Sequence, residues 1–211
     1  MVDGGQPGNP DFTPVLDGRF TPILDGRFTP VLDGRFTPVL DGHVPALARI
    51  YNHYVEHSDW AFNTEPVDET GMRRRLRFDD PRNAAFTILV DGTIAGFVAA
   101  HPFRPGTAYD QTTELSLYLA PDRAGHRLGT AAKAFIVDYA RHQGFHVALG
   151  AVVAGNIAAI ALATHSGFVQ VGHFREIGRK GDRWLDLVWF ELLLDSPECA
   201  PPPPELHSKL S

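Results

Sequence analysis

The chain has 211 residues, of which 44% are hydrophobic, and this length suits one well-buried core rather than two complete ones. Its formal net charge of -6 provides no general attraction for phosphate backbones or anionic lipid surfaces, which argues against nucleic acid and membrane partners. The single cysteine, Cys199, excludes an intrachain disulfide and a thiolate metal cluster, and residues 1–11 lack the apolar run of a signal peptide, so we expect a cytoplasmic protein.

An eight-residue unit of the type FTPVLDGR occurs four times in tandem, beginning at Phe12, Phe20, Phe28 and Phe36. Each unit contains a proline and an Asp-Gly turn signal, and the period is shorter than the roughly 20–50 residues of solenoid repeats, so we expect no stacked repeat fold. Two interpretations stay open, a partner-binding arm or duplication of the segment that forms the first strand. Because the last copy adjoins the first helix, 36–40 is the predicted strand, and the other copies are expected to be mobile or to compete for that sheet edge.

Helical and β-type patterns alternate beyond the repeats. Apolar residues keep helical spacing from Val44 onward, and Asp91-Gly92 is a two-residue turn signal between two apolar runs. This mixed order predicts an α/β fold, or α+β sandwich, with helices on both faces of one sheet. In chain order, the expected elements are a helix from residue 44, a basic-faced helix over 68–78, a hairpin of strands 84–90 and 94–101, a strand over 114–119, a helix from 128, a strand over 146–153, a helix over 156–166, and strands over 168–174 and 183–194.

These patterns divide the chain into three parts. Residues 1–35 form a low-complexity octapeptide-repeat arm, 36–195 form the folded domain, and 196–211, which include the prolines from Pro201 to Pro204, form a disordered tail.

A loop with glycines and basic residues, Arg123-Ala-Gly-His-Arg-Leu-Gly-Thr130, connects a strand to a helix. Unpaired backbone N–H groups and the helix dipole at such a junction form an anion site, although the same pattern is compatible with an ordinary connection. The loop lacks the spacing of a Walker P-loop and of the dinucleotide fingerprint, so ATP and NAD are disfavoured as ligands.

Several motifs then follow in a fixed order between residues 36 and 194. They are Ile50-Tyr-Asn-His-Tyr-Val55, Asn63-Thr-Glu-Pro66, Ala108-Tyr-Asp-Gln-Thr-Thr-Glu114, Gly155-Asn-Ile-Ala-Ala-Ile160, Ser166-Gly-Phe168 and Gly181-Asp-Arg-Trp-Leu-Asp186. Together they resemble the GNAT superfamily of N-acetyltransferases, and within it the phosphinothricin acetyltransferase-like proteins. The resemblance implies a GNAT fold over 36–195, with a mixed central sheet that is splayed at the acetyl-CoA site.

The resemblance also implies roles for individual residues. Glu114 corresponds to the general base that removes a proton from the acceptor ammonium, although a plain surface glutamate would fit the same strand pattern. Asn156 either caps the last helix or binds the cofactor, and both roles can coexist. The acceptor pocket would involve Phe62, Tyr109 and Trp184, unless these aromatics are simply core residues. The implied acetyl-CoA contacts are Leu117, Tyr118 and Leu119 for pantetheine, paired like an added strand, and Gly125, His126, Arg127, Leu128, Gly129 and Thr130 for the pyrophosphate, together with Asn156.

Two positions depart from the family pattern. Arg127 stands where the first glycine of a Gly-x-Gly pair belongs, and its side chain would either crowd the pyrophosphate or add a positive charge. Ala163 stands where related enzymes have a Tyr or His that is thought to protonate the departing CoA thiolate. His165 cannot replace it, since two helical steps rotate a side chain by about 200°. General acid catalysis contributes roughly 100- to 10,000-fold, so Ala163 predicts a slow enzyme, whereas Arg127 predicts weakened cofactor binding without loss of the site.

Other polar clusters give no stronger prediction. His53 and His57 lie four residues apart on the first helix, but no third ligand is near in the sequence, so we expect no metal. The run Arg73-Arg-Arg75 is interpreted as a solvated helix face.

Our leading hypothesis is acetyl transfer from acetyl-CoA to the amino group of a small amino acid analogue such as phosphinothricin or methionine sulfoximine. Within enzymes, the alternative acceptors are another small amine or a peptide N-terminus. Two alternatives belong to other classes: a catalytically weak acyl-CoA-binding or regulatory module, and an interaction protein whose repeat arm carries the function. The resemblance further implies a possible homodimer.

Overall fold

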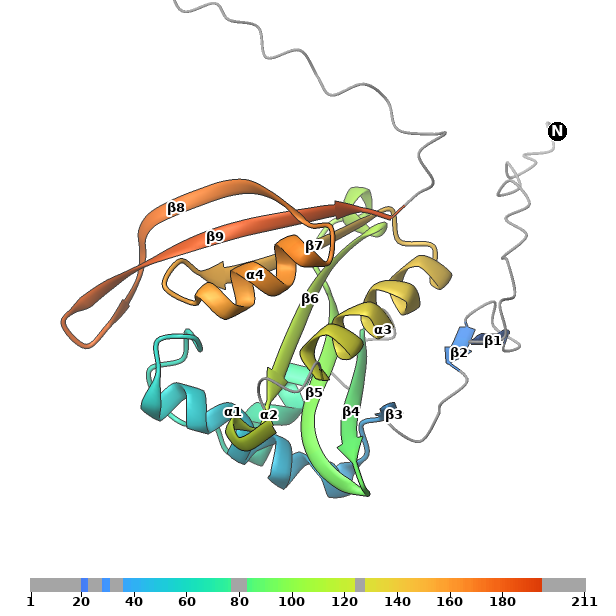
Figure 1. The fold of residues 1–211 in the computed structure, drawn as a ribbon, viewed down its shortest axis with the longest axis horizontal. Coiled ribbons are helices and arrows are strands. Elements are labelled where there is room, and N and C mark those ends of the chain that lie inside the picture. The colour runs from blue at the N-terminus through green and yellow to red at the C-terminus, as the bar shows by residue number, and fades with distance from the viewer. Residues whose placement is uncertain (1–19, 23–27, 31–35, 77–82, 124–127, 195–211) are drawn as a thin grey trace, which may run out of the picture.

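The computed structural model describes residues 20–22, 28–30, 36–76, 83–123 and 128–194. Its chain order of elements confirms the predicted α/β class (Figure 1). The elements are β1 (Phe20–Pro22), β2 (Phe28–Pro30), β3 (Phe36–Pro38), α1 (Val44–His57), α2 (Glu69–Leu76), β4 (Ala84–Val90), β5 (Thr93–Pro102), β6 (Thr112–Leu119), α3 (Leu128–His142), β7 (Val147–Val153), α4 (Ile157–His165), β8 (Val169–Lys180) and β9 (Arg183–Leu193), with short 3-10 turns at 41–43, 107–109 and 121–123.

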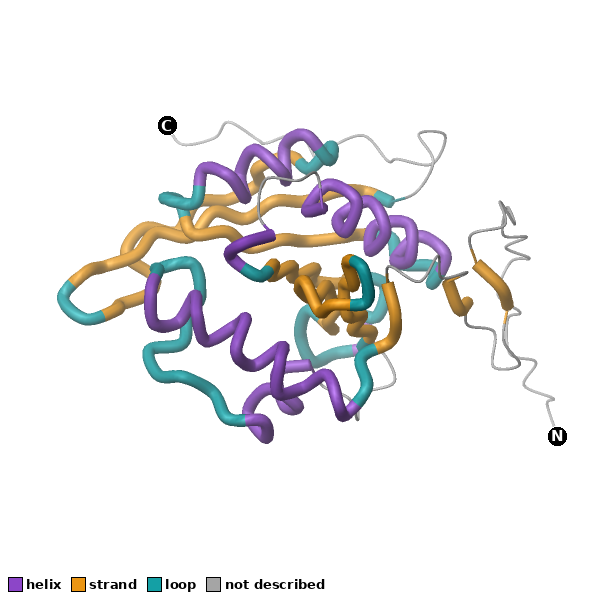
Figure 2. Tube along the Cα trace, turned by 60° about the horizontal axis from the view of Figure 1, so that its bottom comes forward, coloured by secondary structure: helices purple, strands orange, loops and turns teal. Residues whose placement is uncertain are grey.

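A seven-stranded mixed sheet runs in the order β3-β4-β5-β6-β7-β9-β8. Helices α3 and α4 cover one face, and α1 and α2 cover the other (Figures 1 and 2), as the resemblance implied. The chain buries an apolar core on each face, one centred on the inner side of α3 and one on the inner side of α1 and α2. Helices α1 and α3 thus bury apolar residues at helical spacing, as the sequence pattern predicted for these two helices.

The sheet opens between β6 and β7, which form its one parallel pair. Three rungs join these strands, and the last of them pairs Glu114 with Leu149. Beyond that rung β6 continues against β5 as far as Leu119, whereas β7 continues against β9 as far as Val153. The splayed sheet that the resemblance implied is therefore present, and it leaves facing strand edges without ladder partners.

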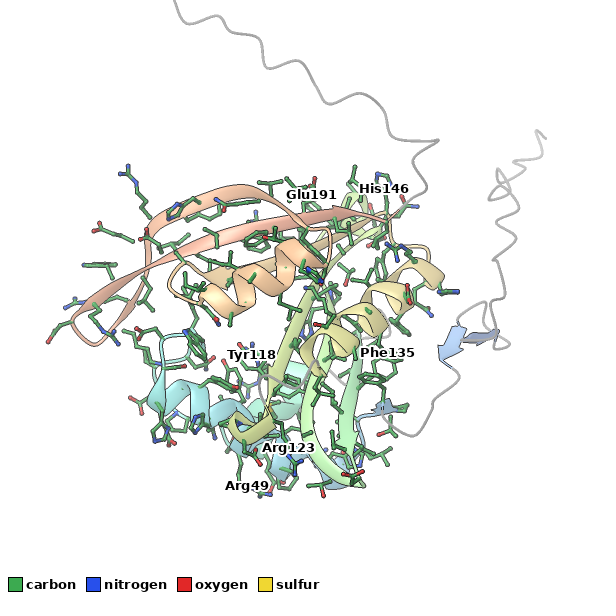
Figure 3. All side chains as sticks on the ribbon, viewed as in Figure 1. Arg49, Tyr118, Arg123, Phe135, His146 and Glu191 are labelled. Atoms are coloured by element: carbon green, nitrogen blue, oxygen red, sulfur yellow. The ribbon has the colours of Figure 1, made fainter. Side chains whose placement is uncertain are left out.

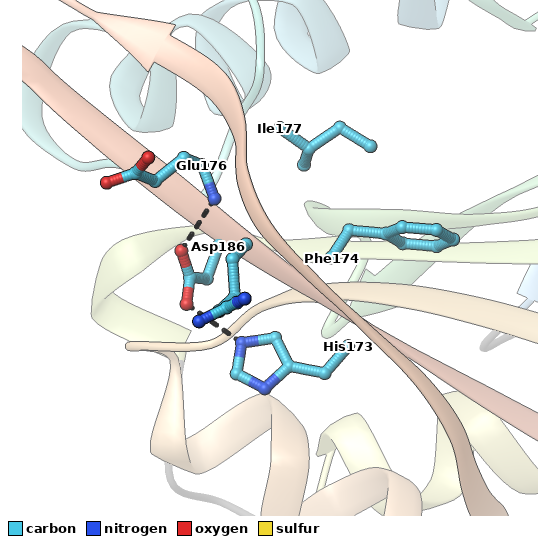
Figure 4. Close-up of a pocket in the computed structure, with 6 residues that line it drawn as sticks. His173, Phe174, Glu176, Ile177 and Asp186 are labelled. Carbon is cyan, nitrogen blue, oxygen red and sulfur yellow. Dashed lines mark hydrogen bonds and ion pairs between the residues drawn. The ribbon is translucent and has the colours of Figure 1, made fainter.

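The β8–β9 hairpin is longer than the sequence pattern predicted. We expected the first of its strands to end at 174, but β8 continues to Lys180 through a register shift between Phe174 and Gly178. Asp186 of β9 holds this bulge: its Oδ1 accepts a hydrogen bond from the Glu176 backbone N–H at 2.8 Å, and its Oδ2 lies 2.8 Å from His173 Nε2 (Figure 4). The bulge breaks the alternation of side chains on which the prediction depended.

The tip of this hairpin docks against the end of α1 and the segment that follows it. Lys180 Nζ donates hydrogen bonds to the carbonyl oxygens of Val55 at 2.5 Å and Ser58 at 2.7 Å. Arg183 Nη2 pairs with Asp59 Oδ1 at 2.6 Å. These contacts join the last two strands of the sheet to the first helix.

The last repeat copy forms the first strand of the sheet, as predicted, although the strand ends at Pro38. Phe36 is buried and stacks at 4.3 Å between ring centroids on Phe135 of α3, which is labelled in Figure 3. Two earlier copies, 20–22 and 28–30, pair with each other in a separate antiparallel ladder. The first copy and the proline-rich tail lie outside the described residues, so the division into arm, domain and tail stays a prediction.

Candidate active site

A cavity of about 730 Å³ lies where β6 and β7 diverge. Residues from both covering layers and from the central strands line it. The lining consists of Tyr51, Tyr54, Trp60, Phe62, Arg75, Glu114, Leu115, Ser116, Leu117, Tyr118, Leu119, Gly129, Thr130, Lys133, Gly150, Ala151, Val152, Val153, Asn156, Ala158, Ala159, Leu162, Ala163, Leu187, Trp189 and Phe190.

The alternation of side chains along β6 divides this cavity into two halves. Tyr118 packs in the core beneath α1 and α2, so Glu114 and Ser116, which share its face, point to the same side. Leu115 and Leu117 pack in the core beneath α3. One half of the cavity therefore has polar and aromatic walls, and the other, called the apolar half, has mainly apolar walls next to the start of α3, with Thr130 and Lys133 as its polar groups from that helix.

The polar half contains an arginine that the sequence analysis assigned to a solvated helix face. That interpretation suits the exposed Arg74 but is wrong for Arg75, whose guanidinium carbon lies 4.1 Å from the centroid of the Tyr51 ring. Arg75 Nη2 donates a hydrogen bond to Tyr118 Oη at 3.4 Å, and its buried Nε has no hydrogen-bond partner among the described residues. A cation held between aromatic rings, with a donor unsatisfied, is suited to binding an anion.

The tyrosines of this half are held in place and remain neutral at physiological pH. Tyr51 Oη donates to Asn63 Oδ1, and Tyr54 Oη donates to the Leu119 carbonyl, both at 2.6 Å. Burial raises the pKa of Tyr51 to about 12, against the opposing influence of Arg75. Burial likewise raises the pKa of Tyr118, which Figure 3 places centrally beside α1, and the neighbouring Glu114 acts in the same direction.

Glu114 occupies the last rung before the strands diverge, and it lines the cavity. A polar chain lies beside it on the neighbouring strand. His101, its ladder partner on β5, has Nε2 2.9 Å from Ser116 Oγ and Nδ1 2.7 Å from Asn83 Oδ1. These contacts place polar side chains next to Glu114 on the face covered by α1 and α2.

Most of the residues expected to contact the cofactor lie together. The cavity is lined by Leu117, Tyr118, Leu119, Gly129, Thr130 and Asn156, whereas Leu128 is buried in the core beneath α3, and Gly125, His126 and Arg127 lie outside the described residues. Asn156 acts as the N-cap of α4, since its Oδ1 accepts a hydrogen bond from the Ala159 backbone N–H at 3.1 Å.

The expected acceptor-side aromatics separate into two groups. Phe62 lines the cavity and packs its ring directly on Gly178 of the β8 bulge. Tyr109 and Trp184 are not among the lining residues: Tyr109 meets the edge of Phe103 at 5.6 Å, and Trp184 on the hairpin is 57% exposed. Ala163 lines the cavity, and His165 is exposed and does not, as helix geometry predicted.

Several lining residues were not assigned to the site from the sequence, and those with polar or aromatic side chains include Tyr51, Tyr54, Trp60, Arg75 and Lys133. The two cations had a detectable signal, because Lys133 interrupts the apolar stripe of α3 four residues from Gly129, and Arg75 lies three residues from the buried Met72. Burial lowers the pKa of Lys133 from 10.5 to about 8. No comparable signal marks Trp60, which lies in the loop after α1.

Neither a metal-binding cluster nor a membrane-spanning helix is found among the described residues. Within the described ranges, no group of three or more His, Cys, Asp or Glu side chains could hold a metal ion. None of the helices described there is both long and apolar enough to cross a membrane.

Comparison with known proteins places this geometry in a family. The sequence profile of the acetyltransferase (GNAT) family matches residues 47–168. The chain is 33% identical to the L-methionine sulfoximine/L-methionine sulfone acetyltransferase of Pseudomonas aeruginosa, with 75% of this chain and 93% of the relative covered. It is 31% identical to the phosphinothricin N-acetyltransferase of Streptomyces coelicolor, over 69% and 87% of the two chains. An acetyltransferase from Salmonella typhimurium, solved with acetyl-CoA, superposes with a TM-score of 0.68 at 27% identity, over 76% and 93% of the two chains. The chain therefore belongs to the GNAT family of acetyltransferases.

Proposed function

We propose that this protein transfers the acetyl group of acetyl-CoA to the α-amino group of a small free amino acid, of the class that includes methionine sulfoximine and phosphinothricin. The observation that carries the proposal is the joint presence of Arg75 and Glu114 in the polar half of one cavity. An amino acid presents a carboxylate and an ammonium a few bonds apart. Arg75 suits the carboxylate and Glu114 suits the ammonium, and the aromatic rings enclose the side chain.

The apolar half suits acetyl-CoA. From Leu115 onward β6 has no ladder partner on its β7 side, so its backbone groups can pair with the amides of pantetheine in the manner of an added strand. Gly129 and Thr130 open α3 at the cavity wall, where backbone N–H groups and the helix dipole favour phosphate. We assign Leu117, Tyr118, Leu119, Gly129, Thr130 and Asn156 to this role, with Gly125, His126 and Arg127 as further expected contacts.

Glu114 supplies the general base. An ammonium is not a nucleophile, so Glu114, directly or through a water, takes a proton from it and leaves an amine facing the thioester. Arg75 and the neutral tyrosines hold the acceptor in one orientation during this step. Phe62 forms the outer wall of the acceptor pocket, and Tyr109 and Trp184 contribute only if the hairpin and the loop before β6 close over the substrate.

The experiment is CoA-thiol release from acetyl-CoA by the purified full chain. The acceptors are L-methionine sulfoximine, L-methionine sulfone and phosphinothricin, each compared with the amine of the same length that lacks the carboxylate. We expect turnover of amino acids, loss of most of it in Glu114→Gln, and a raised KM for amino acids alone in Arg75→Met. Equal turnover of the decarboxylated amines, or of a peptide N-terminus, would contradict the acceptor assignment. Stabilisation by acetyl-CoA without any turnover would instead support a cofactor-binding module.

Two further parts of the proposal concern the protein as a whole. A cytoplasmic location is supported by the single cysteine, Cys199. A homodimer is supported by exposed apolar side chains on the edge strand β8, among them Val169, Val171 and Ile177. Light scattering of the full chain should give twice the chain mass, and a mass of 23.2 kDa would contradict the dimer.

A further inference from the structure

Lys133 places an ammonium group inside the cavity from the sheet-facing side of α3. It occupies a position in the stripe of α3 that otherwise carries buried apolar residues such as Ala132, Ile136 and Val137, and only 8% of the side chain is exposed. Its Nζ lies 4.2 Å from the centroid of the Phe168 ring. In the part of the chain that the structure describes, this ammonium forms no hydrogen bond or ion pair. An unpaired buried charge is costly, and groups of this kind cluster at functional sites.

The ammonium lies at the apex of the diverging strands. A Cβ atom added to Gly150 would be 3.8 Å from Lys133 Nζ, an ordinary contact distance, so the ammonium lies next to the backbone of Gly150. Gly150 directly follows Leu149, which forms the last β6–β7 rung with Glu114. Glu114 approaches that rung from the face covered by α1 and α2, and Lys133 approaches it from the face covered by α3. The Glu114 carboxylate and the Lys133 ammonium therefore approach the same end of the gap between β6 and β7 from opposite faces of the sheet.

During acetyl transfer, the departing sulfur of CoA needs a proton at this end of the cavity. When the amide bond forms, the sulfur of CoA leaves with the electron pair of the C–S bond. Ala163 occupies the α4 position at which the family resemblance implies a proton donor, and its methyl group has no proton to give. Ala163 and Lys133 line the same cavity, and the Ala163 carbonyl accepts a hydrogen bond at 3.1 Å from the backbone of Phe168, the residue whose ring lies under the ammonium.

We propose that the Lys133 ammonium protonates the sulfur of CoA as the thioester C–S bond breaks, in place of the missing acid on α4. This inference rests on the proposed acetyl transfer. Glu114 removes one proton from the acceptor ammonium, the nitrogen forms a bond to the carbonyl carbon, and the C–S electron pair passes to sulfur, which takes a proton from Lys133. The second nitrogen proton leaves to solvent through Glu114 or water. Lys133 regains a proton from solvent, so each turnover releases one proton, one amide and one thiol.

The protonation of Lys133 suits this role. With a pKa of about 8 the group is mostly charged at neutral pH, and it is closer in acidity to a thiol than an ordinary lysine is. Among the described residues that line the cavity, the other charged or titratable side chains come from the opposite face or from β6, and those of β7, α4 and β9 add none. They are Tyr51 and Tyr54 of α1, Arg75 of α2, and Glu114 and Tyr118 of β6.

The kinetic test uses Lys133→Met and Lys133→Arg in the full chain, with Arg141→Met on the exposed face of α3 as the matched control. We expect the rate of the wild type to fall above about pH 8, and we expect Lys133→Met to remove this fall and to lower kcat roughly 100-fold with little change in the KM for acetyl-CoA. Lys133→Arg keeps the positive charge but does not release its proton, so it should not restore the rate. Recovery of the rate by arginine would show a purely electrostatic role and overturn proton donation.

A second readout needs no acceptor and no turnover. CoA is titrated with the protein in place, and the thiolate is followed by its ultraviolet absorbance. We expect wild type and the Arg141→Met control to lower the pKa of the bound thiol, because thiolate and ammonium pair, and we expect Lys133→Met to abolish this effect. A bound thiol that titrates identically in all three proteins would overturn the proposal, as would mass spectrometric detection of an acetyl group on Lys133 after incubation with acetyl-CoA. If the wild type acetylates no amino acid, the proposed function fails. The titration then still tests whether the Lys133 ammonium lies next to the sulfur of bound CoA.

Discussion

Removing the buried charge of Lys133 should change the pH dependence of stability in a specific way. Burial lowers the pKa of this group from 10.5 to about 8 in the folded protein. Below about pH 8 the group is charged in both the folded and the unfolded state, so the folded state carries the full penalty of the buried charge. Between the two values the unfolded chain binds a proton that the folded protein does not, and the free energy of unfolding rises with pH. Above 10.5 both states are neutral and the penalty is gone.

The magnitude follows from the two pKa values. At about 1.4 kcal/mol per pKa unit, the penalty that wild type loses across this window is about 3 kcal/mol. Lys133→Met has no such group and keeps the apolar stem, so its advantage over wild type should shrink by that amount as the pH rises from about 7 to about 10.5. Other titrating groups are common to both proteins and cancel in the difference.

The assay is urea unfolding of the two proteins, followed by tryptophan fluorescence, at several pH values in this window. The informative quantity is the change with pH in the difference between their free energies of unfolding, because the packing of methionine adds only a constant offset. A difference that stays the same from about pH 7 to about pH 10.5 would refute the assignment of Lys133 as a buried cation with a lowered pKa.

Further predictions concern the surroundings of the site. Lys180→Met removes the hydrogen bonds that tie the hairpin to the end of α1 and should lower the free energy of unfolding by roughly 1–3 kcal/mol in urea titrations, with an unchanged value contradicting this docking. Gly178→Ala places a Cβ against the Phe62 ring and should raise the KM of the amino acid while sparing that of acetyl-CoA, and steady-state kinetics with each substrate varied would expose the opposite pattern. Deletion of residues 1–35 retains β3 and should leave kcat unchanged. A large loss of turnover would show that the repeat arm contributes to function.

Local patterns in the sequence predicted most of the fold. The Asp91-Gly92 turn and the helical spacing from Val44 correspond to the observed hairpin and to α1, because turn chemistry and apolar periodicity are local properties. The length of β8 could not be predicted in this way. Its bulge depends on Asp186, which lies ten residues beyond Glu176 in sequence and meets it only in the folded hairpin.

The site was predictable where a motif carried it and not where burial decided it. Glu114 and Asn156 came from motifs, and both line the cavity. Arg75 and Lys133 belong to no motif: their spacing from buried apolar residues is a weak signal, and because charged residues are usually solvated, the packing of α2 and α3 against the sheet decides that these two line the cavity. Trp184 belongs to a recognised motif, but its ring is exposed on the β8–β9 hairpin and does not line the cavity.

The most direct test of the central claim is a comparison of CoA-thiol release by wild type and Glu114→Gln with L-methionine sulfoximine and with the same compound lacking its carboxylate. We predict turnover of the amino acid alone, and a loss of roughly 100-fold or more in Glu114→Gln while thermal stabilisation by acetyl-CoA is retained. Equal turnover by the two proteins, or equal turnover of the two acceptors, would contradict the account of a cavity in which Glu114 takes the proton of the amine and Arg75 holds the carboxylate.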